Sequence, residues 1–136
     1  MLAENTVLTG RRAITRSYAK INLTLDVLSK RENGYHDIKM IMQTVSLFDL
    51  ILVDKTHRGI SISTNLPYLP CNEKNIAYKA ADAFFKATGI RGGAKIVIHK
   101  NIPVAAGLAG GSGNCAAVLT AINMLHGNPL SNDELM

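Results

Sequence analysis

The segment KINLTLDVLSKRENGYHDIKMIMQTV, residues 20–45, indicates the fold more clearly than any other stretch of the chain. From Ile21 to Val27 every second residue is apolar and the residues between are polar, which is the period of a strand with one apolar face. Asn33-Gly34 then provides a turn signal between two extended segments. The segment therefore predicts two strands joined by a turn.

The rest of the chain continues this strand-rich pattern. Further strands are predicted over residues 38–47, 49–54 and 59–65, a loop over 66–75, and a short strand within 93–103. This succession is typical of a meander of strands, not of alternating strands and helices.

Two helices are predicted, one over residues 75–88 and one from Ser112 to His126. Gly89 and Gly127 end them, because glycine commonly terminates helices. The residues expected to face the core are Ile76, Ala80, Phe84 and Ala87 on the first helix, and Ala116, Leu119 and Ile122 on the second.

Composition and charge describe a folded, soluble protein. With 136 residues, 47% of them hydrophobic and 18% charged, the chain is expected to form one compact domain. It contains no apolar run of membrane-spanning length and no apolar leader in its first sixteen residues, so a cytoplasmic protein without a membrane partner is expected. The net charge of +5 suits an anionic ligand, either nucleotide or nucleic acid.

The cysteines and histidines give no sign of a metal site. Cys71 and Cys115 are far apart and lack C-x-x-C spacing, so reduced thiols are expected. The four histidines show no i,i+4 pairing and no carboxylate at ligand spacing, so no metal site built by the protein is predicted.

The segment PVAAGLAGGSGNCAA, residues 103–117, places four glycines around the start of the second helix. Backbone without side chains can approach a ligand closely, and free N–H groups at a helix start favour a phosphate. The alternative is a flexible surface loop. A Walker loop is excluded because no lysine follows Gly107. A dinucleotide fingerprint matches formally as Gly111-x-Gly113-x-x-Ala116, but ten residues separate it from the preceding strand instead of none.

The glycine-rich segment resembles the phosphate loop of the galactokinase, homoserine kinase, mevalonate kinase and phosphomevalonate kinase superfamily, whose core is P-x-x-x-G-L-G/A-S/G-S-S/G. The segment SYAKINLTLDVLSKRENGYHDIKMIMQTV, residues 17–45, is similar to one family within it, the 4-diphosphocytidyl-2-C-methyl-D-erythritol kinases, through its A-K-I-N-L strand and its K-R-x-x-G-Y-H turn. The two motifs stand in the expected order, and the resemblance covers the chain from about Arg16 onward.

The resemblance implies a fold and an activity. The implied fold is α+β, a two-layer domain like ribosomal protein S5 domain 2, with a mixed sheet and helices on one face. The implied activity is ATP-dependent phosphorylation of the 2-hydroxyl of 4-diphosphocytidyl-2-C-methyl-D-erythritol, with Mg²⁺ accompanying the nucleotide. The implied partners are this small-molecule substrate and ATP, and no nucleic acid.

The resemblance also assigns roles to residues on the substrate side. Lys20 is implied beside the reacting hydroxyl, where a cation can stabilise transferring charge, and Asn22 lies two residues along on the same predicted face. Tyr35 and His36 are implied to bind the cytosine, the ring of Tyr35 by stacking and the imidazole by hydrogen bonding. Without the resemblance, Lys20 would be interpreted as a solvated lysine and Tyr35 as a ring covering the edge of the core.

On the nucleotide side the resemblance implies a continuous set of contacts. The residues expected to bind ATP are Pro103, Val104, Ala105, Ala106, Gly107, Leu108, Ala109, Gly110, Gly111, Ser112 and Gly113, together with Asn75 and Lys100. Three of these have ordinary structural alternatives: Asn75 and Ser112 as helix caps, and Lys100 as a lysine at the end of a strand.

The sequence departs from the family pattern at three points. Gly113 replaces a residue that is commonly serine, so one hydroxyl for phosphate or magnesium is missing. Met42 stands where some relatives have an aromatic residue. The general-base aspartate implied by the family matches no aspartate here and is expected beyond residue 136; Asp26 lies on the substrate-facing side of its strand but outside that motif.

The end of the chain suggests a piece of a longer protein. Ser131 and Glu134 form a capping-box pattern that announces a helix, yet only two residues follow Glu134. We therefore expect residues 1–15 to be an extension and residues 16–136 a truncated kinase N-terminal domain, with the C-terminal domain absent. Such a fragment is expected to be inactive, and it could expose apolar surface and self-associate.

Two other functions remain open from the sequence. The first is a non-catalytic RNA-binding or scaffold module, because the implied fold also occurs in RNA-associated proteins and the chain is basic; few aromatics and no basic stripe speak against it. The second is a related kinase acting on a different alcohol, which the G-Y-H turn disfavours.

Overall fold

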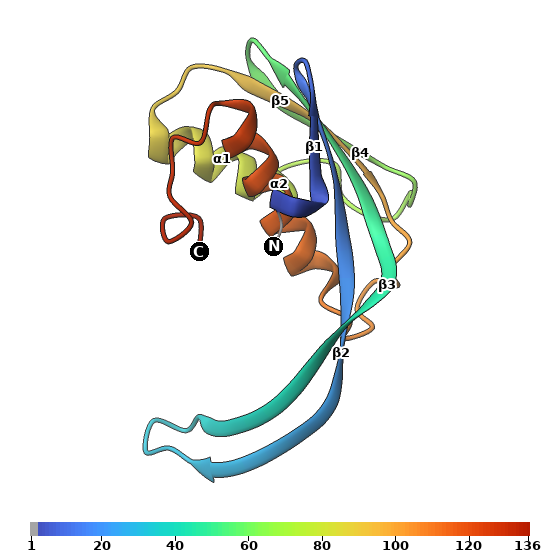
Figure 1. Ribbon diagram of the computed structural model, residues 1–136, viewed down its shortest axis with the longest axis vertical. Coiled ribbons are helices and arrows are strands. Elements are labelled where there is room, and N and C mark those ends of the chain that lie inside the picture. The colour runs from blue at the N-terminus through green and yellow to red at the C-terminus, as the bar shows by residue number, and fades with distance from the viewer. Residues whose placement is uncertain (1–2) are drawn as a thin grey trace.

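The computed structural model describes residues 3–136 (Figure 1). A short 3-10 turn, Ala3–Asn5, precedes the strands β1 (Thr6–Thr9), β2 (Arg12–Lys30), β3 (His36–Thr56) and β4 (Gly59–Thr64). Helix α1 (Ile76–Thr88), strand β5 (Gly93–His99) and helix α2 (Gly110–Leu125) complete the element order.

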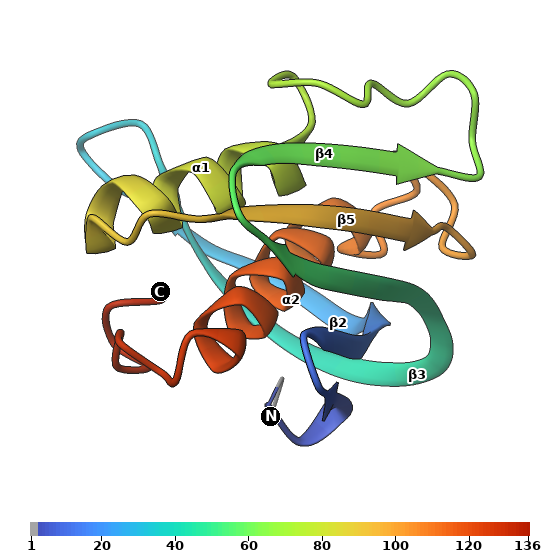
Figure 2. The ribbon, with the colours of Figure 1, turned by 90° about the horizontal axis from the view of Figure 1, so that it is seen from above.

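The strands form one mixed sheet in the order β1-β2-β3-β5-β4. All neighbouring pairs are antiparallel except β4 and β5, which are parallel and are connected through α1. Both helices lie on the same face of the sheet (Figures 1 and 2). The predicted α+β class, with a mixed sheet and helices on one face, is confirmed. The predicted simple meander is wrong for β4-α1-β5, because a parallel pair needs a crossover.

The core lies between this face of the sheet and the two helices. It is built from Ala13, Ile51, Val53, Ile62, Ala94, Ile96 and Ile98 of the sheet and from Ala77, Ala80, Ala81, Phe84, Ala117, Val118, Ala121 and Ile122 of the helices. Small alanines on both helices let them approach the sheet and each other closely. Within the sheet, Gly93 lets the starts of β4 and β5 approach closely, because a Cβ there would lie 2.2 Å from the carbonyl oxygen of Gly59.

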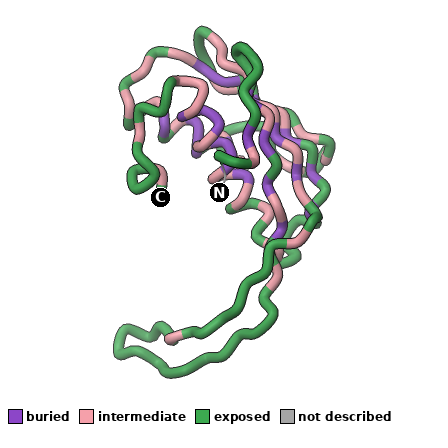
Figure 3. Tube along the Cα trace, in the orientation of Figure 1, coloured by how far each residue is buried: buried purple, intermediate pink, exposed green. Residues whose placement is uncertain are grey.

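The strands β2 and β3 continue past the helices as a long two-stranded arm, residues 20–45 (Figure 1). The alternation over Ile21–Val27 correctly predicted a strand, and its partner begins directly after the Asn33-Gly34 turn. The apolar face that it predicted is nevertheless not buried: Leu23, Leu25 and Val27 are each more than half exposed. Figure 3 shows the arm exposed along nearly its whole length.

The helices differ from prediction in their ends and faces. Asn75 caps α1 and Gly89 ends it, as expected, and Ala80 and Phe84 are buried. Ile76 and Ala87 are exposed, because Ala77 and Ala81 complete the buried stripe in their place. Helix α2 begins two residues earlier than predicted. Of the face expected from Ala116, Leu119 and Ile122 only Ile122 is fully buried, with Ala117, Val118 and Ala121 beside it.

The boundary expected between residues 15 and 16 falls inside the sheet, while the capping box predicted near the C-terminal end does form. Residues 6–15, expected as part of an extension, form β1 and the first residues of β2, and Ala13 and Thr15 are fully buried. The boundary expected between residues 15 and 16 is therefore not a boundary of the sheet. The capping box does form, with the Ser131 N–H donating to Glu134 Oε2 at 2.8 Å, but it closes a turn.

Candidate nucleotide-binding site

The glycine-rich segment forms the connection between β5 and α2. Ala105, Gly107 and Ala109 adopt positive φ angles of 59°, 71° and 60°, so the backbone turns sharply before α2 begins at Gly110. Ala109 occupies the N-cap position and offers no side chain to the helix. Ser112 is therefore not the cap, contrary to one of its predicted roles, but lies within the first turn of the helix. The N–H groups at this helix start face no side-chain cap, which suits them to bind an anion.

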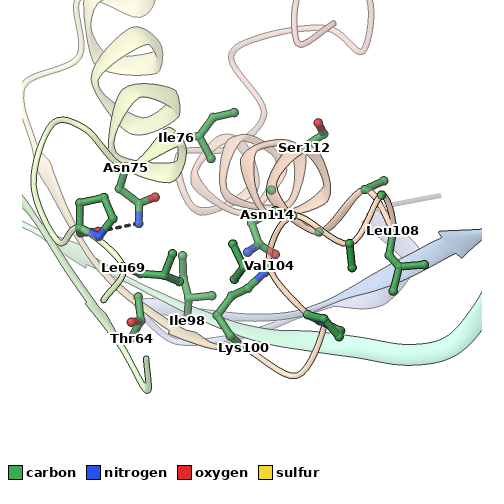
Figure 4. Close-up of a pocket in the computed structure, with 18 of the residues that line it drawn as sticks. Thr64, Leu69, Asn75, Ile76, Ile98, Lys100, Val104, Leu108, Ser112 and Asn114 are labelled. Atoms are coloured by element: carbon green, nitrogen blue, oxygen red, sulfur yellow. Dashed lines mark hydrogen bonds between the residues drawn. The ribbon is translucent and has the colours of Figure 1, made fainter. Parts of the chain in front are cut away.

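A pocket of about 500 Å³ opens beside this loop (Figure 4). Its walls come from the end of β4, the loop before α1, the end of β5 and the start of α2. All predicted nucleotide residues except Gly113 line it: Asn75, Lys100, Pro103, Val104, Ala105, Ala106, Gly107, Leu108, Ala109, Gly110, Gly111 and Ser112. Among these predicted residues the chain brings together positions as far apart as Asn75 and Ser112 around one cavity.

Asn75 both begins α1 and borders the pocket. Its side-chain oxygen accepts a hydrogen bond from the Ala77 N–H at 2.9 Å, and its amide group donates to the Pro70 carbonyl at 2.8 Å. The predicted cap is confirmed. Because both ends of the side chain are held, Asn75 also fixes the loop that forms one wall of the pocket.

Lys100 extends beneath the start of α2 and is held by a buried ion pair. Its ammonium donates to Asp49, and the two side chains are 5% and 0% exposed. The other carboxylate oxygen of Asp49 accepts the N–H groups of Asn101 at 2.7 Å and Ile102 at 2.8 Å. Asp49 therefore fixes the point where the chain leaves β5 and enters the glycine-rich loop. It was not among the predicted site residues, because 51 positions separate it from Lys100.

A second pocket of about 510 Å³ lies at the other side of the α2 start. Lys20, Thr44 and Tyr18 line it from the sheet, and Ser112 and Gly113 line it from the helix. The backbone N–H of Lys20 donates to the Leu108 carbonyl at 3.1 Å, which ties the base of the arm to the glycine-rich loop. The structure thus brings Lys20 next to the first turn of α2.

The other predicted substrate residues lie along the arm. Asn22 is opposite Met42 near its base, while Tyr35 and His36 are at its tip. Tyr35 is 74% exposed, and its N–H donates to the side chain of Asn33 at 3.1 Å in the turn. About ten residues of strand separate the tip from Lys20, which corresponds to roughly 30 Å along the arm. The structure does not bring Tyr35 and His36 together with Lys20.

Several features bear on cofactors and environment. Among residues 3–136 there is no group of three or more His, Cys, Asp or Glu side chains placed to hold a metal ion. Cys71 and Cys115 are free, and partial burial raises the pKa of the Cys115 thiol. None of the helices in this described range is long and apolar enough to cross a membrane.

Comparison with known proteins shows which proteins this chain resembles in sequence. Residues 75–136 match the family described as GHMP kinases N terminal domain. The 4-diphosphocytidyl-2-C-methyl-D-erythritol kinase of Clostridium botulinum (strain Eklund 17B / Type B) is 50% identical over 121 residues, which are 89% of this chain and 43% of that protein. The protein of the same name from Caldicellulosiruptor saccharolyticus is 52% identical over 124 residues, 90% of this chain and 43% of the relative. This chain spans less than half the length of the curated relatives that it matches.

Solved structures agree with this placement. A crystal structure of 4-(cytidine 5'-diphospho)-2C-methyl-D-erythritol kinase superposes with a TM-score of 0.79 at 35% identity, over 90% of this chain and 44% of that one. A homoserine kinase from Cytophaga hutchinsonii, at 20% identity and a TM-score of 0.69 over 95% of this chain and 40% of that one, shares the fold. The chain is therefore similar over most of its length to part of the 4-diphosphocytidyl-2-C-methyl-D-erythritol kinases, and its residues 75–136 match the GHMP kinase N-terminal domain.

Proposed function

We propose that this chain is the nucleotide-binding part of an ATP-dependent kinase that phosphorylates the 2-hydroxyl of 4-diphosphocytidyl-2-C-methyl-D-erythritol. The observation that carries the proposal is the position of the α2 start between two pockets. One pocket holds Asn75 and Lys100, and the other holds Lys20. Phosphoryl transfer requires a donor and an acceptor on either side of one phosphate, and this arrangement offers a place for each.

On the donor side the adenine of ATP would lie near Asn75, with the phosphates directed along residues 103–113 toward α2. The first turn of α2 carries no acidic residue that would repel them. Its free N–H groups and the aligned peptide dipoles favour the negative charge. Lys100, held by Asp49 below the loop, adds a cation close to Gly110, where a Cβ would be 3.3 Å from the ammonium nitrogen.

On the acceptor side Lys20 would lie next to the hydroxyl that receives the phosphate. Its ammonium stabilises negative charge that develops during transfer. Asn22, close by on the same strand, is available for a hydrogen bond to the substrate. Because the Lys20 N–H is bonded to the Leu108 carbonyl, the backbone from which this side chain extends keeps a fixed position relative to the glycine-rich loop.

Magnesium would accompany the nucleotide. The described residues lack an acidic cluster of their own, so phosphate oxygens would be its main ligands, with the Ser112 hydroxyl within the helix turn that receives them. When bound, the ion neutralises charge on the transferring phosphoryl group.

Proton removal from the acceptor hydroxyl is not assigned to these residues. Glu4 lines the same pocket as Lys20 but is exposed on the 3-10 turn before β1, and no contact within residues 3–136 holds it against the acceptor. Asp26 is exposed on the arm, and Asp49 is fully engaged with Lys100 and two backbone N–H groups. A base must reach the proton that it takes. We therefore expect the 136-residue chain to bind ATP without turning it over, and the aspartate implied by the family stays a prediction.

Cytidine binding is proposed at the tip of the arm, where Tyr35 offers an exposed ring for stacking. Because roughly 30 Å of arm separates this tip from Lys20, one substrate molecule contacts both only when the arm bends toward the body. The test is calorimetric titration of the chain with ATP–Mg²⁺, adenosine and, separately, cytidine diphosphate. Wild type should bind ATP more tightly than adenosine. Tyr35→Ala should weaken cytidine diphosphate binding about tenfold, the value of one stacked base, and leave ATP binding unchanged.

The matched control is Tyr68→Ala, since Tyr68 is also exposed, at 69%, but lies outside both pockets. It should change neither affinity. Equal losses of affinity for both nucleotides in Tyr35→Ala would contradict the stacking role. A wild-type chain that binds ATP no better than adenosine would contradict phosphate binding by the glycine-rich loop and the start of α2.

A further inference from the structure

Ser17 occupies space at the start of α2 that a side chain at position 113 would need. A Cβ built on Gly113 would lie 2.6 Å from the Ser17 hydroxyl oxygen, closer than side chains are found in proteins. Gly113 is the fourth residue of α2, and Ser17 reaches it from β2. A side chain at position 113 would therefore require the Ser17 hydroxyl to move.

The Ser17 hydroxyl is buried without a hydrogen-bond partner. The residue is 1% exposed, and its oxygen contacts no donor or acceptor within bonding distance in residues 3–136. Leaving such a group unsatisfied costs about 1–3 kcal/mol. Thr15, two residues earlier on the same face of β2, does have a partner, since its hydroxyl accepts from Thr6 at 2.8 Å. The same face of one strand thus carries one satisfied and one unsatisfied hydroxyl.

The position of Ser17 gives this hydroxyl a use. It lines the second pocket together with Lys20, Ser112 and Gly113, next to a helix start without a side-chain cap. A hydroxyl there can donate to an oxygen of an anion that the helix N–H groups and Lys20 also attract. Gly113 itself offers no hydroxyl to this helix start, so Ser17 is the side chain that places one beside it.

We propose that Ser17 supplies from β2 the hydroxyl that position 113 lacks, and that it binds a phosphate oxygen of the nucleotide at the start of α2. This inference rests on the proposed function. The O–H of Ser17 donates to the phosphate oxygen, so its unsatisfied state ends when the ligand binds.

The test is a hydroxyl exchange with four proteins: wild type, Ser17→Ala, Gly113→Ser, and the double variant. For each, thermal unfolding gives stability, and titration with ATP–Mg²⁺ and with adenosine gives affinity. Ser17→Ala should raise the melting temperature, because it removes an unsatisfied buried hydroxyl, yet weaken ATP binding about tenfold, the loss of one hydrogen bond to a charged group. Adenosine binding should not change.

Gly113→Ser should lower the melting temperature through its clash with Ser17. In the double variant the clash is gone and the hydroxyl is back on the helix, so both stability and ATP affinity should recover. A merely structural serine would change stability and affinity in the same direction.

The outcomes separate this inference from the proposed function. If wild type binds ATP more tightly than adenosine and Ser17→Ala keeps the full difference in affinity, the role of Ser17 is overturned, while phosphate binding at the start of α2 is supported. A lower melting temperature for Ser17→Ala would also overturn it. If wild type shows no preference for ATP, the proposed function fails, and this inference fails with it.

Discussion

Strands β2 and β3 run through both the arm and the rest of the domain, which we call the body. They are hydrogen-bonded to each other in both regions, but their burial differs. In the body, β2 and β3 bury one face under α1 and α2, and Ile51 and Val53 are completely shielded from water. In the arm, residues 20–45, the ladder continues with one register shift at its base, between Tyr18 and Lys20, and two farther along, but no helix covers it. Leu25 opposite Met40 and Val27 opposite Ile38 form apolar cross-strand pairs that stay largely exposed.

The difference shows what pairing alone contributes. A two-stranded ribbon is marginally stable in water, and sheets gain stability from what packs on their faces. The arm is joined to the body by continuous strands and by the bond from Lys20 to Leu108, so it depends on the body for its position. Equivalent substitutions in the two regions should therefore have unequal effects.

The largest contrast is expected between two ion pairs. Asp49→Ala removes the buried acceptor of three hydrogen bonds and leaves the Lys100 ammonium uncompensated, which should cost about 3–5 kcal/mol of unfolding free energy. In the arm, Asp37 pairs with Arg31, whose guanidinium, with Ser29, lowers the pKa of that carboxyl. Asp37→Ala should leave unfolding unchanged within error, because the pair is solvated. Urea denaturation measures both.

An equal loss of unfolding free energy in the two variants would mean that the arm contributes as much to folding stability as the body does. If Asp49→Ala unfolds the protein outright, Asp49→Asn provides a milder comparison. It keeps an oxygen for the N–H groups of Asn101 and Ile102 but removes the charge that Lys100 needs.

The second contrast uses two isoleucines of the same strand. Ile51→Ala empties a fully buried site on β3 and should cost about 2–5 kcal/mol. Ile41→Ala, ten residues earlier and 54% exposed, should change the unfolding free energy by no more than about 0.5 kcal/mol. Urea midpoints of the two variants and wild type decide this. A large effect of Ile41→Ala would show that the arm face is covered in solution.

The smallest effect concerns pH and lies wholly in the body. His126 packs against Phe84 and Phe85, and its burial, followed by the charge of Lys55, lowers its pKa below the ordinary 6.5. The unfolded chain therefore takes up a proton at higher pH than the folded one, so stability falls as pH drops below about 6.5. It stops falling below the folded pKa.

His126→Gln removes this titration. Comparing unfolding free energies at pH 7.5 and 5.5 should show a loss for wild type that is smaller in the variant. These pH values lie above the range in which the carboxyl groups with lowered pKa values, such as Asp54 and Glu134, take up protons. Identical losses in the two proteins would contradict the burial of a neutral His126.

Local chemistry made much of the fold predictable. The Asn75 cap, the Gly89 stop and the Asn33-Gly34 turn each depend on a few neighbouring residues, and all three are found where predicted. The alternation in residues 21–27 predicted the strand but not its exposure. A period of two says which side chains share a face, and only the rest of the fold decides whether anything covers that face.

The contacts that complete the site depend on long-range packing. The motif located the loop and Lys20, but Asp49 reaches Lys100 across 51 positions, and Ser17 faces Gly113 across the interface of β2 and α2. The helix start was misplaced because Gly110 and Gly111 have low helix propensity, and only the turn at Ala109 fixes where α2 begins. Neither pair lies within a short stretch of the sequence, so local patterns could not predict these contacts.

The single bond from the Lys20 N–H to the Leu108 carbonyl has a consequence for measurement. An amide held in this way exchanges its hydrogen with solvent only when the bond opens, which here requires the arm base and the phosphate loop to separate. Deuterium uptake at this one position therefore reports how often the base of the arm and the glycine-rich loop come apart.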